Sequence, residues 1–305
     1  MRTFTIESED LIARVEPAFG GSIGSLAARD GTAILRPTPE APKSFADLAM
    51  YPLCPWSNRI AEARFEFKGV EHRLRPDWPD GSAIDGVLKE AMVSPIDRTP
   101  VSARLMHEHA ADNRWPWSFR AEVRHEVDGP TFASRLTLTA LDGPMPAGLG
   151  WHPHFAASED ATITCPGLDA RYPAVDCLPT GPPSEDATTR SLREGSTLGE
   201  LDELDDCFAG SLDGAHIRTA SHWVMLGCSD ELTHGVVYTG NGSPKRFVCL
   251  KPMSHATNAV NLPPNEQQDS QQPDNWQPGV RTLGAGETMT SELRITVRAH
   301  ENGGA

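Results

Sequence analysis

Basic residues are scarce in this chain. Lys and Arg together number 27 against 42 Asp and Glu, so the 305 residues carry a formal net charge of −15 at pH 7. This acidic balance argues against nucleic acid or an anionic membrane surface as a partner, because both are themselves negative. Only five of the basic residues are lysines (Lys43, Lys68, Lys89, Lys245 and Lys251). A lysine in an apolar segment therefore marks a candidate functional position.

Paired cysteines and long apolar runs are also missing. The six cysteines are spread from Cys54 to Cys249 without C-x-x-C spacing, which argues against a zinc ribbon. The chain is too long for a small disulfide-stapled scaffold. Residues 1–7 lack the apolar core of a signal peptide, and no apolar run has transmembrane length. We expect a cytoplasmic protein with reduced thiols.

Helical periodicity is rare, and it predicts one short helical turn within residues 191–204. Alternation of apolar and polar residues, typical of strands, recurs throughout the chain. It is seen at residues 4–15, 63–68, 101–105, 117–124, 132–141, 223–227, 235–238, 246–250 and 292–297. The 26 glycines and 26 prolines suit the many turns of such a protein. The pattern predicts an all-β fold, either a sandwich or a barrel.

No linker separates two apolar cores, so residues 1–300 are predicted to form one domain. Residues 263–278 read as a polar insertion, rich in Gln, Asn, Asp and Pro, and predict a mobile loop. Residues 301–305 predict a flexible C-terminal tail.

The segment 148–155 (GLGWHPHF) holds the strongest functional pattern. Glycine allows close approach of a ligand, and Trp151 offers a flat apolar face. His152 offers a proton near neutral pH, so the segment predicts the floor of a pocket for a polar ring. A buried histidine with a structural hydrogen bond is the alternative.

Three further segments carry candidate residues. Asn58 and Arg59 lie in a Pro-rich turn, where a guanidinium suits sugar hydroxyls or a carboxylate, although a surface arginine is the plainer interpretation. Asp205 and Asp206 are adjacent, so in an extended chain one of them can face a pocket; a solvated acidic turn is the alternative. Lys251 ends an apolar strand, where a charge needs a partner unless it reaches solvent.

These segments, in this order, resemble the aldose 1-epimerase (galactose mutarotase-like) family along nearly the whole chain. The resemblance extends over Gly20-Gly21, residues 58–60, 81–93, 115–119, 144–155, 204–208 and 251–259, and Gly286-Glu287. It implies a large antiparallel β-sandwich, the galactose mutarotase-like supersandwich, with no metal and no organic cofactor.

The resemblance implies interconversion of the α and β anomers of a free monosaccharide by acid–base ring opening. His152 matches the family's general acid, which protonates the ring oxygen. Arg59 and Asp205 match the residues that hold sugar hydroxyls, and we add Asn58 and Trp151 to the expected substrate-binding set. Asp206 stands where many members have a histidine or another polar residue.

Two positions depart from the family pattern. Asp85 stands where many members have a histidine before the glycine, and Lys251 stands in place of the catalytic glutamate. We expect an Asp85–Lys251 ion pair inside the pocket, with Asp85 as the only nearby carboxylate able to serve as base. The catalytic set predicted from the sequence is therefore His152, Lys251 and Asp85.

Two alternatives remain open at this stage. Lys251 could bind an acidic sugar, or form a Schiff base with a keto sugar in a different reaction. Loss of the glutamate also suits a non-catalytic sugar-binding or regulatory protein. The pairs His152/His154 and His107/His109 have strand spacing for a shared metal ligand set, but nothing in the sequence completes such a site. A small-molecule sugar is the expected partner, and the chain is expected to be a monomer or homodimer.

Overall fold

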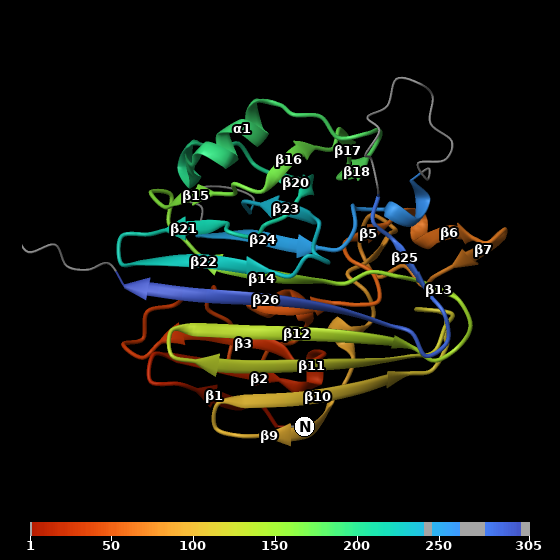
Figure 1. The fold of residues 1–305 in the computed structure, drawn as a ribbon, viewed down its shortest axis with the longest axis horizontal. Helices are drawn as coiled ribbons and strands as arrows, with labels where there is room; N and C mark the ends of the chain where they lie inside the picture. Colours follow the sequence, from red (N-terminus) through yellow and green to blue (C-terminus); the bar gives the residue numbers. More distant parts are fainter. Residues whose placement is uncertain (1, 241–245, 263–277, 300–305) are drawn as a thin grey trace, which may run out of the picture.

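Two large antiparallel sheets dominate the computed structural model, which describes residues 2–240, 246–262 and 278–299 (Figure 1). The predicted loop at 263–278, apart from its last residue, and the predicted tail at 301–305 lie outside the described residues. In spatial order, the first sheet consists of β1 (Phe4–Glu7), β2 (Leu11–Glu16), β3 (Ser22–Ala28), β4 (Met50–Leu53), β14 (Gly150–Ala156), β24 (Phe247–Met253), β23 (His234–Tyr238), β20 (Asp205–Gly210) and β16 (Leu168–Arg171).

The second sheet packs across the first, in front of it in Figure 1. It consists of β19 (Ser196–Thr197), β15 (Thr162–Thr164), β21 (His216–Arg218), β22 (His222–Cys228), β26 (Thr288–Ala299), β12 (Thr131–Ala140), β11 (Phe119–Asp128), β10 (Ser102–His109) and β9 (Ser94–Arg98). This arrangement confirms the predicted large antiparallel β-sandwich.

Short elements complete the described chain. Two-stranded ribbons are formed by β5 (Arg59–Ile60) with β8 (Ala83–Ile84), β6 (Arg64–Phe67) with β7 (Val70–Arg73), β13 (Met145–Ala147) with β25 (Arg281–Leu283), and β17 (Ala174–Val175) with β18 (Leu178–Pro179). The helices are α1 (Ala187–Glu194) and the 3₁₀ turns η1 (Pro17–Phe19), η2 (Phe45–Asp47), η3 (Ala61–Ala63), η4 (Leu88–Glu90), η5 (Leu198–Glu200) and η6 (Ala259–Asn261). Within the described residues, none of these helices has the length and apolar character needed to cross a membrane.

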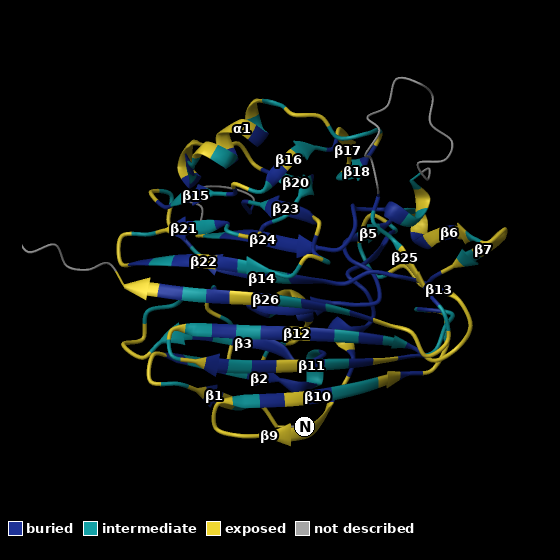
Figure 2. Cartoon of the chain, in the orientation of Figure 1, coloured by how far each residue is buried: buried dark blue, intermediate teal, exposed yellow. Residues whose placement is uncertain are grey.

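The central strands of the first sheet, β4, β14, β23 and β24, are covered on both faces, whereas the second sheet is covered on one. In β11 and β12 buried residues alternate with more exposed ones, which is the pattern of a half-buried strand (Figure 2). β24 is buried along Val248–Met253, because one set of its side chains enters the inter-sheet core and the other a second apolar cluster. That second cluster includes Phe45, Leu53 and Met253. The outer face of the first sheet is therefore a covered surface that can hold a pocket.

The structure differs from the sequence prediction at two elements. The alternating stretch 4–15 is a hairpin rather than one strand, because Ser8 Oγ accepts hydrogen bonds from the backbone N–H groups of Asp10 and Leu11 and turns the chain. The 3₁₀ turn η5 fits the helical turn predicted within 191–204, but helix α1, whose start was not predicted, begins at Ala187 and runs into this stretch. Asp186 caps that helix by accepting from the Thr189 N–H at 2.8 Å, and the helix ends before Gly195.

Candidate functional site

The floor of the candidate site is the outer face of the first sheet, and the strand register decides which side chains are neighbours on it. In one row Tyr51 pairs with His152 across β4 and β14, and Lys251 pairs with Val236 across β24 and β23. In the next row His154 pairs with Cys249, which pairs with Tyr238, which pairs with Asp205. Because side chains two apart on a strand share a face, His152, His154, Cys249 and Lys251 lie on the same face of the sheet, and His152, His154 and Lys251 line the cavity.

The cavity above this floor has a volume of about 520 Å³, within the usual range for a small-molecule site. The ribbon formed by β5 and β8 closes one side and contributes Arg59 and Ile84. Phe45, Trp78 and Phe247 add aromatic surface to the lining. A cavity with apolar rings and several polar groups suits a polar ring such as a sugar.

Asp85 and Lys251 form a buried ion pair in the wall of this cavity. Lys251 Nζ donates to Asp85 Oδ1 at 2.8 Å, and the two side chains are 4% and 2% exposed. The same carboxylate accepts from the Asn58 N–H at 3.0 Å and from Tyr51 Oη at 3.2 Å. Burial, and next the charge of Asp85, raise the pKa of Tyr51 well above its usual value, so its hydroxyl remains a donor. Both oxygens of Asp85 are therefore engaged.

The loop that carries Asp85 is held from behind by a second buried lysine. Asp85 has a left-handed backbone (φ 57°) and is followed by Gly86 (φ 72°). A Cβ at Gly86 would lie 2.0 Å from the Cys54 carbonyl oxygen, so only glycine fits. Lys89 Nζ donates to the carbonyls of Ile84 and Gly86, which flank Asp85, at 2.7 and 2.8 Å. Lys89 also pairs with Asp77 at 2.7 Å and therefore fixes the loop.

His152 lines the cavity beside a row of cationic and neutral groups. Its ring stacks on His154 at 4.4 Å between centroids and lies 4.7 Å from the ring of Tyr51. Burial lowers the pKa of His152 well below its usual value, and the charges of Lys251 and Arg36 act in the same direction. The pKa of His154 is lowered for the same first reason, burial. Both rings are therefore neutral at neutral pH.

His152, His154 and Cys249 are also the described residues whose geometry could hold a metal ion. One ligand atom from each lies within 4.8 Å of the others. The positive charges of Arg36 and Lys251 act on both histidines, and burial raises the pKa of the Cys249 thiol. These features oppose a cation and a thiolate, so we assign no metal to this cluster.

Arg59 lies at the rim between two carboxylates. Its Nε is 3.0 Å from Asp80 Oδ2 and its Nη2 is 3.5 Å from Asp205 Oδ2. Burial alone would lower the pKa of Arg59, but Asp205 and then other neighbours leave that pKa raised. Asp206 does not line this cavity and pairs with Arg171 at 3.4 Å. The adjacent acids therefore face different surroundings, as the extended backbone predicts.

Asn58 and Trp151 differ in where the structure places them. Asn58 lines the cavity, and its side-chain oxygen accepts from the Arg59 N–H at 2.9 Å, which fixes the turn. Trp151 is fully buried in the core between the sheets and does not line the cavity. It precedes His152 on β14, so its side chain points to the other face. Among the described residues, the tryptophan that lines the cavity is Trp78.

Sequence reasoning missed several residues of or behind this site, among them Arg36, Tyr51, Trp78, Cys177 and Lys89. The scarcity of lysine is a signal for Lys89, which is buried despite its charge. Tyr51, one of three tyrosines in the chain, precedes the Pro-rich turn that holds Arg59. No local pattern marks Arg36, which hydrogen-bonds the Leu48 carbonyl through Nη2 at 2.8 Å and reaches the cavity only in the folded chain.

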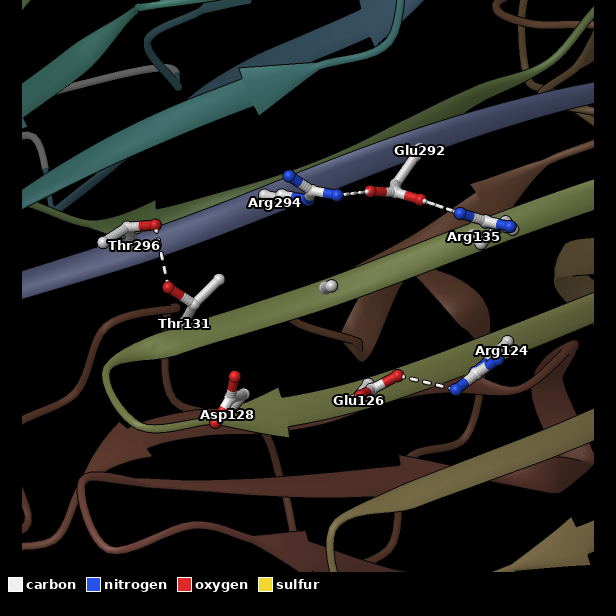
Figure 3. Close-up of a pocket in the computed structure, with 9 residues that line it drawn as sticks. Arg124, Glu126, Asp128, Thr131, Arg135, Glu292, Arg294 and Thr296 are labelled. Carbon is white, nitrogen blue, oxygen red and sulfur yellow. Dashed lines mark hydrogen bonds and ion pairs between the residues drawn. The ribbon is translucent and has the colours of Figure 1, made fainter.

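A second hollow, of about 530 Å³, lies on the outer face of the second sheet (Figure 3). Glu292 of β26 pairs there with Arg135 and Arg294, each at 2.7 Å, and Arg124 pairs with Glu126 at 2.8 Å. Charges paired along exposed strands are typical of a solvated sheet face.

The second histidine pair also belongs to this sheet. His107 Nδ1 and His109 Nε2 lie within hydrogen-bond distance of the Met92 and Trp115 carbonyls, at 3.2 and 3.1 Å, and neither ring lines the cavity. The two pairs His107/His109 and His152/His154 are therefore not parts of one site.

Known structures share this fold. An Escherichia coli K12 protein assigned by name to the aldose 1-epimerases superposes with a TM-score of 0.83 at 22% identity, covering 98% of this chain and 99% of that one. A galactose mutarotase-like protein from Clostridium acetobutylicum gives a TM-score of 0.81 at 17% identity, covering 97% and 94%. Galactose 1-epimerase from Lactobacillus acidophilus gives 0.76 at 16% identity, covering 97% and 94%.

Comparison of the sequence with known proteins gives further evidence of relationship. The uncharacterized protein YphB of Escherichia coli K12 is 29% identical over 140 residues, which span 44% of this chain and 46% of that curated relative. The family model for aldose 1-epimerase matches residues 2–296. With its antiparallel sandwich and its sugar-sized cavity on the first sheet, the chain belongs to the aldose 1-epimerase family.

Proposed function

We propose that this protein interconverts the α and β anomers of a free monosaccharide. One observation carries the proposal: a single cavity brings together an ammonium group held by a carboxylate (Lys251 with Asp85) and a neutral imidazole (His152). Ring opening of a hemiacetal needs one proton given and one taken, and this pair offers a group for each. General acid–base assistance of this kind is worth about 10²- to 10⁴-fold per group.

The rim supplies the contacts that orient the ring. Arg59 presents several N–H donors and Asp205 presents acceptors, so together they can bind two hydroxyls that are neighbours on a sugar. Trp78 offers an aromatic face for the apolar side of the ring. Asn58 holds both Arg59 and Asp85 in place through its side chain and its backbone N–H.

The ion pair disfavours a covalent role for Lys251. Schiff-base formation needs a free amine that can reach the substrate carbonyl, whereas Lys251 Nζ is held against the Asp85 carboxylate at 2.8 Å. Proton transfer requires no loss of that partner. Acid–base ring opening is therefore the chemistry that this arrangement supports best.

Mutarotation of freshly dissolved α-glucose, α-galactose and a pentose, followed by polarimetry or by NMR exchange, tests the proposal. We expect acceleration over buffer for at least one sugar, and a loss of about 10²-fold or more in His152→Gln. The His109→Gln variant, on the other sheet, is the control and should keep the wild-type rate per folded molecule. Rates equal to buffer for every sugar would contradict the proposal.

A further inference from the structure

We infer that the two proton roles in this site are the reverse of those that the family resemblance predicts: Lys251 gives a proton to the ring oxygen, and His152 takes the proton of the anomeric hydroxyl. The inference rests on the proposed function and adds the direction of each transfer.

Lys251 has the surroundings of a proton donor. Its ammonium group is bound to Asp85 at 2.8 Å, with both side chains buried, and it lines the cavity. An ammonium group carries three donor hydrogens, so one bound to Asp85 leaves others for the substrate. The family resemblance predicts a glutamate at this position, which accepts the anomeric proton. A cation cannot accept it.

Asp85 is a poor candidate for the base. Its Oδ1 accepts from Lys251 and from the Asn58 N–H, and its Oδ2 accepts from the Tyr51 hydroxyl. These three donors occupy both oxygens of the carboxylate, so a sugar hydroxyl would have to compete with them to reach it.

His152 has the surroundings of a base. Its Nδ1 is buried and has no hydrogen-bond partner among the described residues. The groups that face the ring are Tyr51 from β4, His154 from its own strand, Cys249 and Lys251 from β24, and Arg36 from the segment before β4. Each of these is neutral or positive, and the Asp85 carboxylate is engaged by Lys251. Burial and these charges lower the pKa of His152, so the resting ring is unprotonated and cannot serve as the acid.

The cycle balances without an external proton carrier. As the C1–O5 bond breaks, O5 takes a proton from Lys251, O1 loses its proton to His152, and C1=O1 forms. The aldehyde then rotates about the C1–C2 bond. On closure O5 attacks C1 and returns its proton to the Lys251 amine, while the His152 imidazolium returns a proton to O1. The positive charge moves from Lys251 to His152 and back.

The pH dependence of kcat/KM separates the two assignments, because it reports the protonation of the free enzyme. With His152 as base, activity is level near neutral pH and falls tenfold per unit at acid pH, below the ordinary histidine value of about 6.5. With His152 as acid, only the protonated ring is active, so kcat/KM falls as the pH rises toward neutral. The second profile would overturn the inference.

Chemical rescue of Lys251→Ala tests the lysine with an added primary amine. Between pH 7 and 9 the methylammonium concentration is nearly constant, whereas free methylamine rises about 100-fold. After subtraction of the enzyme-free rate, a rescue independent of pH supports donation by the ammonium form. A rescue that rises with the free amine contradicts it. The double variant Lys251→Ala/Asp85→Asn removes the unpaired anion and provides a second background if the single variant folds poorly.

Substitution of Lys251 by glutamate, the residue that the family resemblance predicts, is a third test. Under the reversed assignment Lys251→Glu lacks the acid and loses at least about 10²-fold in kcat/KM. A rate equal to or above wild type means that the family roles are retained. These outcomes bear on the inference only where wild-type protein accelerates mutarotation; absence of that acceleration would instead contradict the proposed function.

Discussion

Asp85 and Lys251 lie 166 positions apart in the chain, and Lys251 Nζ donates to Asp85 Oδ1 across 2.8 Å in the wall of the cavity. The two charges occupy the positions where the family resemblance predicts a histidine and a glutamate. The pair moves the carboxylate to the other wall of the cavity and puts a cation in its expected place. This exchange has consequences for stability as well as for proton transfer.

Lys251→Met should destabilise the protein by about 3–5 kcal/mol, because it leaves Asp85 buried and without its cation. The double variant Lys251→Met/Asp85→Asn should regain most of that loss, since the anion is gone. Urea unfolding at pH 7 gives the free energies of unfolding. Equal destabilisation in the single and double variants would show that the buried charge is not the cause.

Arg59→Lys should raise KM for the sugar about tenfold with a smaller change in kcat, because a single ammonium cannot bridge Asp205 and a hydroxyl as the guanidinium fork does. Arg171→Lys is the matched control, since Arg171 pairs with the adjacent Asp206 outside the cavity. Steady-state mutarotation kinetics measure both constants. A similar rise in KM in both variants would assign the effect to the strand rather than to the site.

Lys89→Met should lower kcat about 10- to 100-fold without removing any group from the cavity lining. Lys89 holds the carbonyls of Ile84 and Gly86 on either side of Asp85, so its loss frees the loop and misplaces the ion pair. The exposed Lys43→Met is the control and should match wild type. Kinetics at a temperature where circular dichroism shows the variant folded separate this effect from unfolding. An unchanged kcat there would exclude a positioning role.

Stability should fall as the pH drops from about 6.5 toward 4. Burial lowers the pKa of His125 to about 4, of His234 to about 3 and of His255 to about 4. The unfolded chain binds protons at these residues near the ordinary value, whereas the folded chain does not. Each of these histidines therefore lowers the free energy of unfolding by about 1.4 kcal/mol per pH unit as the pH falls through this window. None of them changes it above the window.

The His125→Gln variant checks this linkage. Its free energy of unfolding should depend on pH less steeply than wild type by about 1.4 kcal/mol per unit between pH 6 and 4.5. Urea titrations at several pH values measure the slope. An unaltered slope would mean that His125 binds its proton equally in the folded and unfolded chains.

Much of the fold is predictable from the chain because alternation is a local property. The patterns at 132–141 and 292–297 correspond to β12 and to part of β26. The hairpin at β1 and β2 was missed although the polar run of residues 7–10 interrupts the alternation and is a local turn signal. The start of helix α1 was also missed, although Asp186 is a local N-cap signal.

The candidate site, like the fold, could be predicted only in part from the sequence. The segment 148–155 could be recognised from its residue types, but Trp151 and His152 both carry suitable chemistry. Neighbours on a strand point to opposite faces, so only one of them can line the cavity. Trp151 packs in the core between the sheets, whereas His152 and the distant Trp78 face the cavity.

By itself the sequence determined the strand character of the chain, the acidic balance and the chemical types at each candidate position, because these depend on residues close together. The tertiary structure decided which side chains share the cavity, that Lys89 supports the loop of Asp85, and that His152 rests as a neutral ring among cations. Those properties come from register between strands far apart in the chain and from burial, which sets how strongly charges act on one another.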